Sequence, residues 1–324
     1  MHVVAKFNQR FSDEEKRPRR QANKIYYMAY EGATEEAYFS ALNNYGQQQG
    51  LGILIQIRPL SREYCEWKKS NPETIVRMML DKFDSWDEGT IKVEEITNQI
   101  DNWLREERII PDKKSFPNAH KDIRKKLGHQ GYPYYRRLGY DEITDEFLEI
   151  LCKCVGEVIR YELTEYKIIE FKKRLDEEAL MKKEEGDKAC LVVDRDPDSF
   201  KEDQYDRVLE TCENNNIDFY VTNPCFEFWL LLHYDEVFTL DPKQLLENPF
   251  MCENPYTHKK DRMTLCKAME FIPGYRKSNI HFDELKGRIN KAIENEKKFC
   301  EDRVKLKNEL GSNVGLLIKE MWEG

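Results

Sequence analysis

Three carboxylates follow one another closely in the stretch Ala189-Cys-Leu-Val-Val-Asp-Arg-Asp-Pro-Asp198. Asp194, Asp196 and Asp198 come directly after a short apolar run that is too brief for a helix and fits a buried strand. Alternate residues leaving a strand face the same side, so Asp194 and Asp196 are expected to converge. Two such carboxylates repel each other unless a cation lies between them, and Mg²⁺ favours oxygen ligands. The other open interpretation is an acidic turn that caps the following helix.

A further carboxylate stands at the end of an earlier predicted strand. Lys24–Tyr30 is rich in aromatic residues, which predicts the first core strand, and the helix after it has Thr34 as its expected N-cap. Glu35 in the first turn of that helix can be explained by the helix dipole. Glu31 has no capping role. Because ligands gather outside the carboxyl ends of parallel strands, Glu31 is expected near Asp194.

The remaining elements predict an α/β sheet with crossover helices. Further strands are expected at Leu51–Pro59 and Ile217–Thr222. A strongly apolar helix follows, with Asn223 as its expected cap and Glu227 in its first turn, where Glu227 could be a ligand or could simply favour the helix N-terminus. A long amphipathic helix is expected over Asp283–Lys305.

Residues 84–186 are expected to form an all-helical insertion between a helix and a strand of this core. Within it, the segment Lys121–Arg137 carries six basic residues against one acid, interleaved with tyrosines. Cations that meet phosphates beside rings that stack on bases are typical of nucleic-acid binding. Two other interpretations stay open, namely a tyrosine loop packed on the core and a surface that docks a partner protein. The candidate contacts are Lys125, Lys126, Tyr134, Tyr135, Arg136 and Arg137.

Composition excludes several classes of protein. A net charge of −9 argues against coating nucleic acid by bulk charge, and no apolar window is long enough to span a membrane. Nine scattered cysteines without a CxxC pair suggest reduced thiols and a cytoplasmic location. Residues 1–23 are polar, with a basic run at Lys16–Arg20, and are expected to form a flexible arm.

Four motifs in order resemble the RloB / AbiLii-like family: Tyr30-Glu-Gly-Ala-Thr-Glu-Glu-Ala-Tyr-Phe39, Val193-Asp-Arg-Asp-Pro197, Asn223-Pro-Cys-Phe-Glu-Phe-Trp-Leu-Leu-Leu-His233 and Pro273-Gly-Tyr-Arg-Lys277. The resemblance covers residues 24–83 and 187–322. A glutamate at the first strand tip and a DxD at a later one also resemble the TOPRIM fold, so the resemblance implies a TOPRIM-like, parallel-rich sheet with a helical C-terminal region. The long insertion departs from this pattern and leaves the choice of substrate in doubt.

The resemblance implies a metal-dependent phosphodiester nuclease that acts in antiphage defence through abortive infection, cleaving DNA, RNA or tRNA. It implies Mg²⁺ or Mn²⁺ as cofactor and an ATPase partner encoded nearby, and self-association into a homo-oligomer is left open. Asp194 and Asp196 would be metal ligands, with Glu31 as a third ligand or general base. Glu35 and Asp198 would complete a second site. Lys277 would neutralise the transition state, with Asn223 and Glu227 behind the ligands.

Three alternatives remain. A haloacid-dehalogenase-like phosphohydrolase also places a DxD after a buried strand, but would leave Glu31 and the NPCFE helix unexplained. A primase or topoisomerase would use the same kind of metal site, but the chain has no room for the tyrosine-bearing domains of a topoisomerase and no zinc module of a primase. The third is a non-catalytic sensor or partner subunit of a defence complex.

Overall fold

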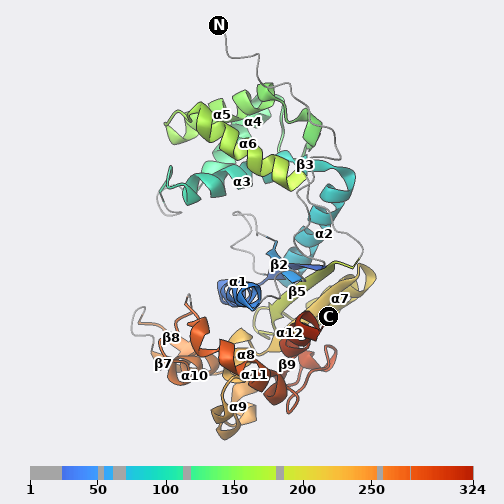
Figure 1. Ribbon diagram of the computed structural model, residues 1–324, viewed down its shortest axis with the longest axis vertical. Helices are drawn as coiled ribbons and strands as arrows, with labels where there is room; N and C mark the ends of the chain where they lie inside the picture. Colours follow the sequence, from blue (N-terminus) through green and yellow to red (C-terminus); the bar gives the residue numbers. More distant parts are fainter. Residues whose placement is uncertain are drawn as a thin grey trace.

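The protein is a mixed α/β structure, seen here in a computed structural model (Figure 1). The structure describes residues 24–49, 55–60, 71–111, 118–179, 186–253, 258–277 and 279–323. The predicted arm at 1–23 lies outside the described residues. No helix in the described ranges has both the length and the apolar character needed to cross a membrane.

A five-stranded sheet with the order β2-β1-β5-β6-β9 forms the centre of the fold. Strands β1, β2, β5 and β6 are parallel, and the short β9 pairs antiparallel to β6. The predicted strands of the core are confirmed, except that residues 51–54 of the predicted second strand lie outside the described residues. The carboxyl ends of β1, β5 and β6 therefore meet at one edge. The strands of this sheet are β1 (Lys24–Tyr30), β2 (Ile55–Pro59), β5 (Lys188–Asp194), β6 (Ile217–Asn223) and β9 (Gly311–Ser312).

Helices cover both faces of the sheet because side chains alternate along each strand. Tyr26 and Met28 of β1 pack in one apolar cluster with α1, α8, α10, α11 and α12. Ala29 of β1 and Leu191 of β5 point the other way, into a cluster with α2 and α7. The helices are α1 (Ala33–Gln48), α2 (Pro72–Glu88), α3 (Val93–Glu106), α4 (Ala119–His129), α5 (Asp145–Ile159), α6 (Glu165–Ala179), α7 (Glu202–Asn214), α8 (Phe226–Leu231), α9 (Pro242–Glu247), α10 (Met263–Phe271), α11 (Ile289–Glu296) and α12 (Val314–Glu323).

The insertion has its own apolar core, which runs from Ile91 to Leu175 and includes the fully buried Trp103. Figure 1 shows α2 leading from the sheet to the group formed by α3, α4, α5 and α6. The prediction of an all-helical insertion is wrong, because β3 (Thr90–Lys92) and β4 (Arg137–Gly139) pair antiparallel within it.

Three predictions of local structure are also wrong. The N-cap of α1 is Gly32, and Thr34 lies inside the helix, where its hydroxyl donates to the carbonyl of Lys277 at 3.0 Å. The N-cap of α8 is Cys225, after a cis Asn223–Pro224 peptide bond, so Asn223 ends β6 instead of capping a helix. In place of the long helix expected over Asp283–Lys305, the chain forms two 3-10 turns, Phe282–Glu284 and Lys286–Arg288, and the short α11, which ends at Glu296.

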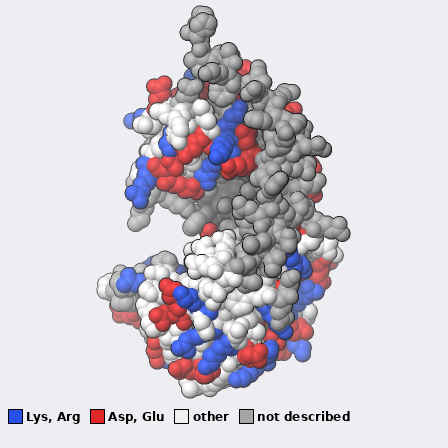
Figure 2. Space-filling model, viewed as in Figure 1, with Lys and Arg blue, Asp and Glu red and all other residues white. Residues whose placement is uncertain are grey.

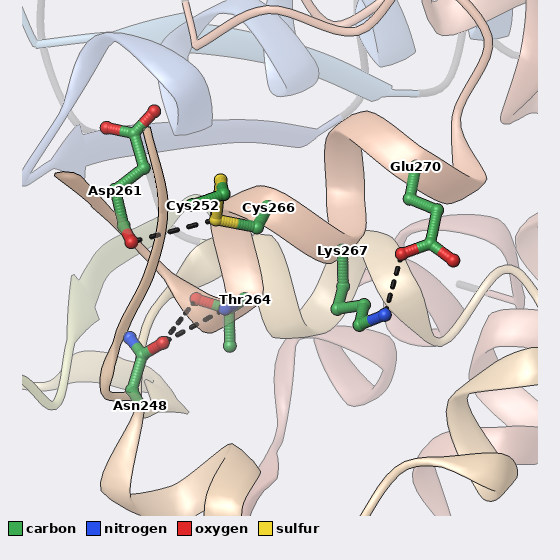
Figure 3. Close-up of a disulfide and its surroundings, with 7 residues drawn as sticks. All are labelled: Asn248, Cys252, Asp261, Thr264, Cys266, Lys267 and Glu270. Carbon is green, nitrogen blue, oxygen red and sulfur yellow. Dashed lines mark hydrogen bonds and ion pairs between the residues drawn. A yellow bond between two sulfur atoms is a disulfide. The ribbon is translucent and has the colours of Figure 1, made fainter. Parts of the chain in front are cut away.

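The prediction that the cysteines are reduced thiols is wrong for two of them. Cys252 of β7 (Phe250–Glu253) and Cys266 of α10 form a disulfide (Figure 3). Strand β7 pairs with β8 (Lys260–Arg262) in a hairpin, so the disulfide ties this hairpin to α10. The spacing of the two cysteines gave no signal, because they meet only after the chain turns back through the hairpin.

Candidate active site

The ends of β1 and β5 bring two carboxylates together. Glu31, the residue after β1, donates its amide to the carbonyl of Val192 and accepts the amide of Asp194 on Oε2 at 3.1 Å. Asp194, the last residue of β5, accepts the amide of Phe226 on Oδ1 at 2.8 Å. Each carboxylate is therefore fixed by a backbone amide of a different segment, and Asp194 connects the sheet to the start of α8.

Glu35 folds back from the first turn of α1 towards the same strand tip. Its residue surface is only 2% exposed. A Cβ atom at position 32 would lie 2.6 Å from a Glu35 carboxylate oxygen, so any other residue there would have to displace this carboxylate. The backbone of Gly32 is extended (φ −133°), so the requirement comes from the neighbouring side chain and not from the backbone.

Glu227 enters from α8 and is 5% exposed. Its Oε1 accepts the Tyr275 hydroxyl at 3.2 Å, and burial together with the Glu227 charge raises the pKa of Tyr275 well above its usual range. Tyr275 therefore stays protonated and acts as a fixed donor. Its place in the Pro273–Lys277 motif was visible in the sequence, but its role was not predicted.

Electrostatics connect these groups into one cluster, called here the carboxylate centre: Glu31, Glu35, Asp194 and Glu227. Removal from solvent raises the pKa of Asp194 well above its ordinary value, and the charges of Glu35, Glu31 and Glu227 raise it further. The same negative charges act on the exposed Lys277. Glu227 first, and then Asp194 and Glu35, raise the pKa of its ammonium group. The centre thus gathers like charges, and the Lys277 ammonium lies close enough to respond to them.

The other two aspartates of the DxDxD stretch have different contacts. Asp196 accepts the amide of Asp198 on Oδ1 at 2.9 Å, which closes the turn after β5. Asp198 forms an ion pair with Arg262 of β8 at 2.7 Å. These contacts arise because β5 ends at Asp194, so the two residues lie in a loop where strand alternation no longer holds.

Two buried side chains, those of Arg195 and Asn223, hold the DxDxD loop by donating hydrogen bonds to backbone carbonyls. Arg195 is buried and donates from Nε to the carbonyl of Lys307 at 2.8 Å and from Nη1 to the carbonyl of Phe200. Asn223 is also buried and donates from Nδ2 to the carbonyl of Leu306 at 2.7 Å. Sequence reasoning did not find Arg195, although an arginine inside an acidic motif was a signal that it might hold backbone carbonyls.

The comparison with protein families identifies residues 141–321 as matching the family described as RloB-like protein. The match covers more than half of the 324 residues. The chain belongs to the RloB-like family. No curated protein and no solved structure is significantly similar to it.

The matched region of this RloB-like protein includes the DxDxD loop, α8 and Lys277 but begins after Glu31 and Glu35. It also includes α5 and α6, which had been assigned to the insertion. The matched region is therefore not the one expected from the motifs, which started at residue 24 and left out residues 84–186.

The carboxylate centre offers the hard oxygen donors that Mg²⁺ and Mn²⁺ prefer. Burial first, and then the nearby negative charges of Glu35, Glu31 and Glu227, raise the pKa of Asp194. Among the described residues, however, no three Asp, Glu, His or Cys side chains already stand in a ligating arrangement. The donor chemistry fits a divalent cation, and the side chains would have to close around it.

The basic segment, Lys121–Arg137, lies on α4 and the loop that leads to β4. Most of its cations pair with glutamates: Arg124 with Glu94, Lys126 with Glu157, Arg136 with Glu142 and Arg137 with Glu88. On the face shown in Figure 2, basic and acidic side chains are interspersed.

The tyrosines of the basic segment differ in exposure. Tyr132 packs on Phe147, and the Arg136 guanidinium lies over the Tyr132 ring, 5.1 Å from the ring centroid. Tyr134 and Tyr135 are exposed and lie edge to face against each other. The interpretation of a tyrosine loop packed on the core therefore holds for Tyr132 alone.

Proposed function

We propose that this RloB-like protein is a divalent-metal-dependent phosphodiester nuclease with a TOPRIM-like site at the carboxyl ends of β1 and β5. The observation that carries the proposal is the environment of Asp194. Burial, and then the charges of three further carboxylates, raise its pKa, and one of these carboxylates, Glu31, accepts its backbone amide. Crowded carboxylates of this kind are costly in a folded protein and are typical of functional sites.

In the proposed site, Asp194 and Glu31 hold the cation, and Glu35 approaches from α1 as a third donor. Bound Mg²⁺ or Mn²⁺ would supply Lewis-acid stabilisation of the phosphate and a more acidic water. Lys277 lies within the field of the same carboxylates, so its ammonium group can neutralise charge that develops on the phosphate. Glu227 and Tyr275 position Lys277 and the start of α8.

The role proposed for the organism is antiphage defence, with an ATPase partner encoded nearby. Family membership is consistent with a defence-associated protein. Expression of the chain with its neighbouring ATPase gene should reduce phage plating, and the Asp194→Asn variant should restore plating. Equal protection by the variant would favour a non-catalytic sensor or partner subunit.

The direct test is cleavage of labelled tRNA, other RNA and DNA by purified protein with Mg²⁺, with Mn²⁺ and with EDTA. We expect cleavage with a metal and none with EDTA. Asp194→Asn should lower the rate more than about 100-fold, since the loss of a group that merely supports a ligand costs 10- to 100-fold. Asp206→Asn is the matched control, because Asp206 is an exposed aspartate on α7 that pairs with Lys307. Metal-independent cleavage, or full activity of Asp194→Asn, would contradict the proposal.

A further inference from the structure

The β7–β8 hairpin displays two large apolar side chains to solvent. Phe250 is 60% exposed and Met251 is 55% exposed, although both lie in a strand. The pairing of β7 with β8 is irregular between Phe250 and Cys252, as at a bulge, and bulges redirect side chains. Adjacent apolar side chains that are exposed in this way can mark a binding surface.

Arg262 connects this exposed ring to the acidic loop. It is the cross-strand partner of Phe250, and its guanidinium lies 4.3 Å from the centroid of the Phe250 ring. The same guanidinium donates to Asp198 at 2.7 Å and to the carbonyl of Asn248 at 3.2 Å. Because one planar group contacts both the ring and Asp198, the ring lies beside the loop that follows Asp194.

The hairpin is also held firmly to the candidate active site. The Cys252–Cys266 disulfide joins β7 to α10, and the Thr264 amide and hydroxyl both donate to Oδ1 of Asn248 at 3.0 Å (Figure 3). The Thr264 hydroxyl is also 3.0 Å from Sγ of Cys225, the residue before Phe226, whose amide binds Asp194. The exposed ring is thus positioned by a covalent bond and a short hydrogen-bonded path to the carboxylate centre.

We propose that Phe250 and Arg262 form a stacking platform for an unpaired base of a single-stranded nucleic acid that reaches the carboxylate centre. The inference rests on the proposed nuclease function and names its substrate class. A base can stack on an exposed ring only when it is not already stacked in a duplex. Arg262 stiffens the ring from one side and, with the exposed Lys260 on the same strand, supplies positive charge for the phosphates.

The test measures binding without cleavage. Fluorescence anisotropy in EDTA, with single-stranded RNA, single-stranded DNA and duplexes of the same sequence, compares the wild type with Phe250→Ala, Phe250→Leu and Phe250→Tyr. Phe238→Leu is the matched control, because Phe238 is also an exposed phenylalanine (41%) with a cation, Lys298, 4.1 Å from its ring. It contacts Phe299 instead of the acidic loop.

We expect the wild type to prefer single strands and Phe250→Tyr to bind like it. Phe250→Ala and Phe250→Leu should bind about 5- to 150-fold more weakly, the cost of one lost base stack, with an unchanged salt dependence. Phe250→Leu keeps apolar surface but lacks a ring, so wild-type binding by this variant would overturn the platform. Equal binding of single strands and duplexes would overturn it as well, and would leave Phe250 as a contact for a protein.

Failure of this inference and failure of the nuclease proposal are separable. Cleavage with Mg²⁺ combined with full binding by Phe250→Leu would retain the nuclease and remove the platform. Single-strand binding that depends on Phe250, with no cleavage under any metal, would retain the platform and remove the nuclease.

Discussion

The carboxylate centre and the basic segment differ in how their charges are arranged. In the centre, four carboxylates from β1, α1, β5 and α8 share a partly desolvated edge of the sheet, with Lys277 near them. In the basic segment, Arg124, Lys126, Arg136 and Arg137 each have a glutamate partner.

This difference shows that a run of one charge in the sequence does not by itself make a charged surface. The local excess of cations at Lys121–Arg137 is largely balanced by glutamates, most of them distant in sequence. The acidic excess at the sheet edge is instead increased by folding, which adds Glu35 and Glu227 to the pair Glu31 and Asp194. Carboxylates crowded into a buried edge, as around Asp194, are the stronger sign of a functional site.

After Asp194→Asn, the largest expected effect comes from a glycine beside the carboxylate centre. Gly32→Ala places a Cβ where the Glu35 carboxylate now lies and should displace that side chain, whose flexible end can move. Misplacement of a reacting group by about 1 Å can cost roughly 100-fold, so cleavage should fall by about that factor with little loss of thermal stability. The control in the insertion is Gly128→Ala on α4, where a Cβ meets nothing within 4 Å. It should leave cleavage unchanged and stabilise the helix by up to about 1 kcal/mol. Unchanged cleavage by Gly32→Ala would remove Glu35 from the site.

Carboxylates in the two parts of the molecule should respond oppositely to pH. Burial raises the pKa of Glu296 on α11 to about 8, whereas the hydrogen bond and charge of Lys126 lower the pKa of the exposed Glu157 in the insertion. Stability from Glu296 is therefore complete below its unfolded pKa of about 4.5 and is lost as the pH rises through about 8. Glu157 contributes stability above its unfolded pKa, and this is lost at lower pH.

Glu296→Gln should thus raise the free energy of unfolding at pH 8 and above by a few kcal/mol and flatten its pH dependence, since each pKa unit is worth about 1.4 kcal/mol. Glu157→Gln should lower the melting temperature slightly at neutral pH and not at all in acid. Denaturant unfolding between pH 5 and pH 9 measures both. A Glu296→Gln variant that keeps the wild-type pH profile would contradict the assignment.

A disulfide stabilises the β7–β8 hairpin near the carboxylate centre, whereas ion pairs stabilise the basic segment around β4. A Cys252→Ser/Cys266→Ser variant should lose up to about 3 kcal/mol of unfolding free energy, as expected for a bond that closes a loop of this length, here a separation of 14 residues. Arg137→Ala, which removes the pair with Glu88, should cost no more than about 1 kcal/mol. A reductant should destabilise the wild type and leave the double-serine variant unchanged.

The smallest effect is expected for nucleic-acid binding by the basic segment. Neutralising Lys125, Lys126, Arg136 and Arg137 together removes three cations that are already paired with glutamates. The slope of log affinity against log salt should therefore change by no more than about one phosphate contact, roughly 0.7–0.9. A change several times larger would mean that these ion pairs open to bind the substrate, and loss of a partner protein instead would favour docking.

The sequence determined the elements of this protein that depend on local pattern. Buried apolar runs fixed β5 and β6, and the aromatic run at Lys24–Tyr30 fixed β1. Strand–helix alternation fixed a mainly parallel sheet, and parallel strands place their carboxyl ends at one edge. The proximity of Glu31 and Asp194 followed from these rules alone, and the 3.1 Å bond between them agrees with it.

Tertiary structure decided what depends on contacts between distant segments. Strand alternation does not predict the direction of the Asp196 side chain, because β5 ends two residues earlier. Within the loop, this side chain accepts the amide of Asp198. The pairing of the basic segment with glutamates, the Cys252–Cys266 bond and the place of Arg262 between Phe250 and Asp198 all join residues whose spacing in the sequence carries no period. Such contacts are set by how the elements pack, and local sequence patterns do not encode that packing.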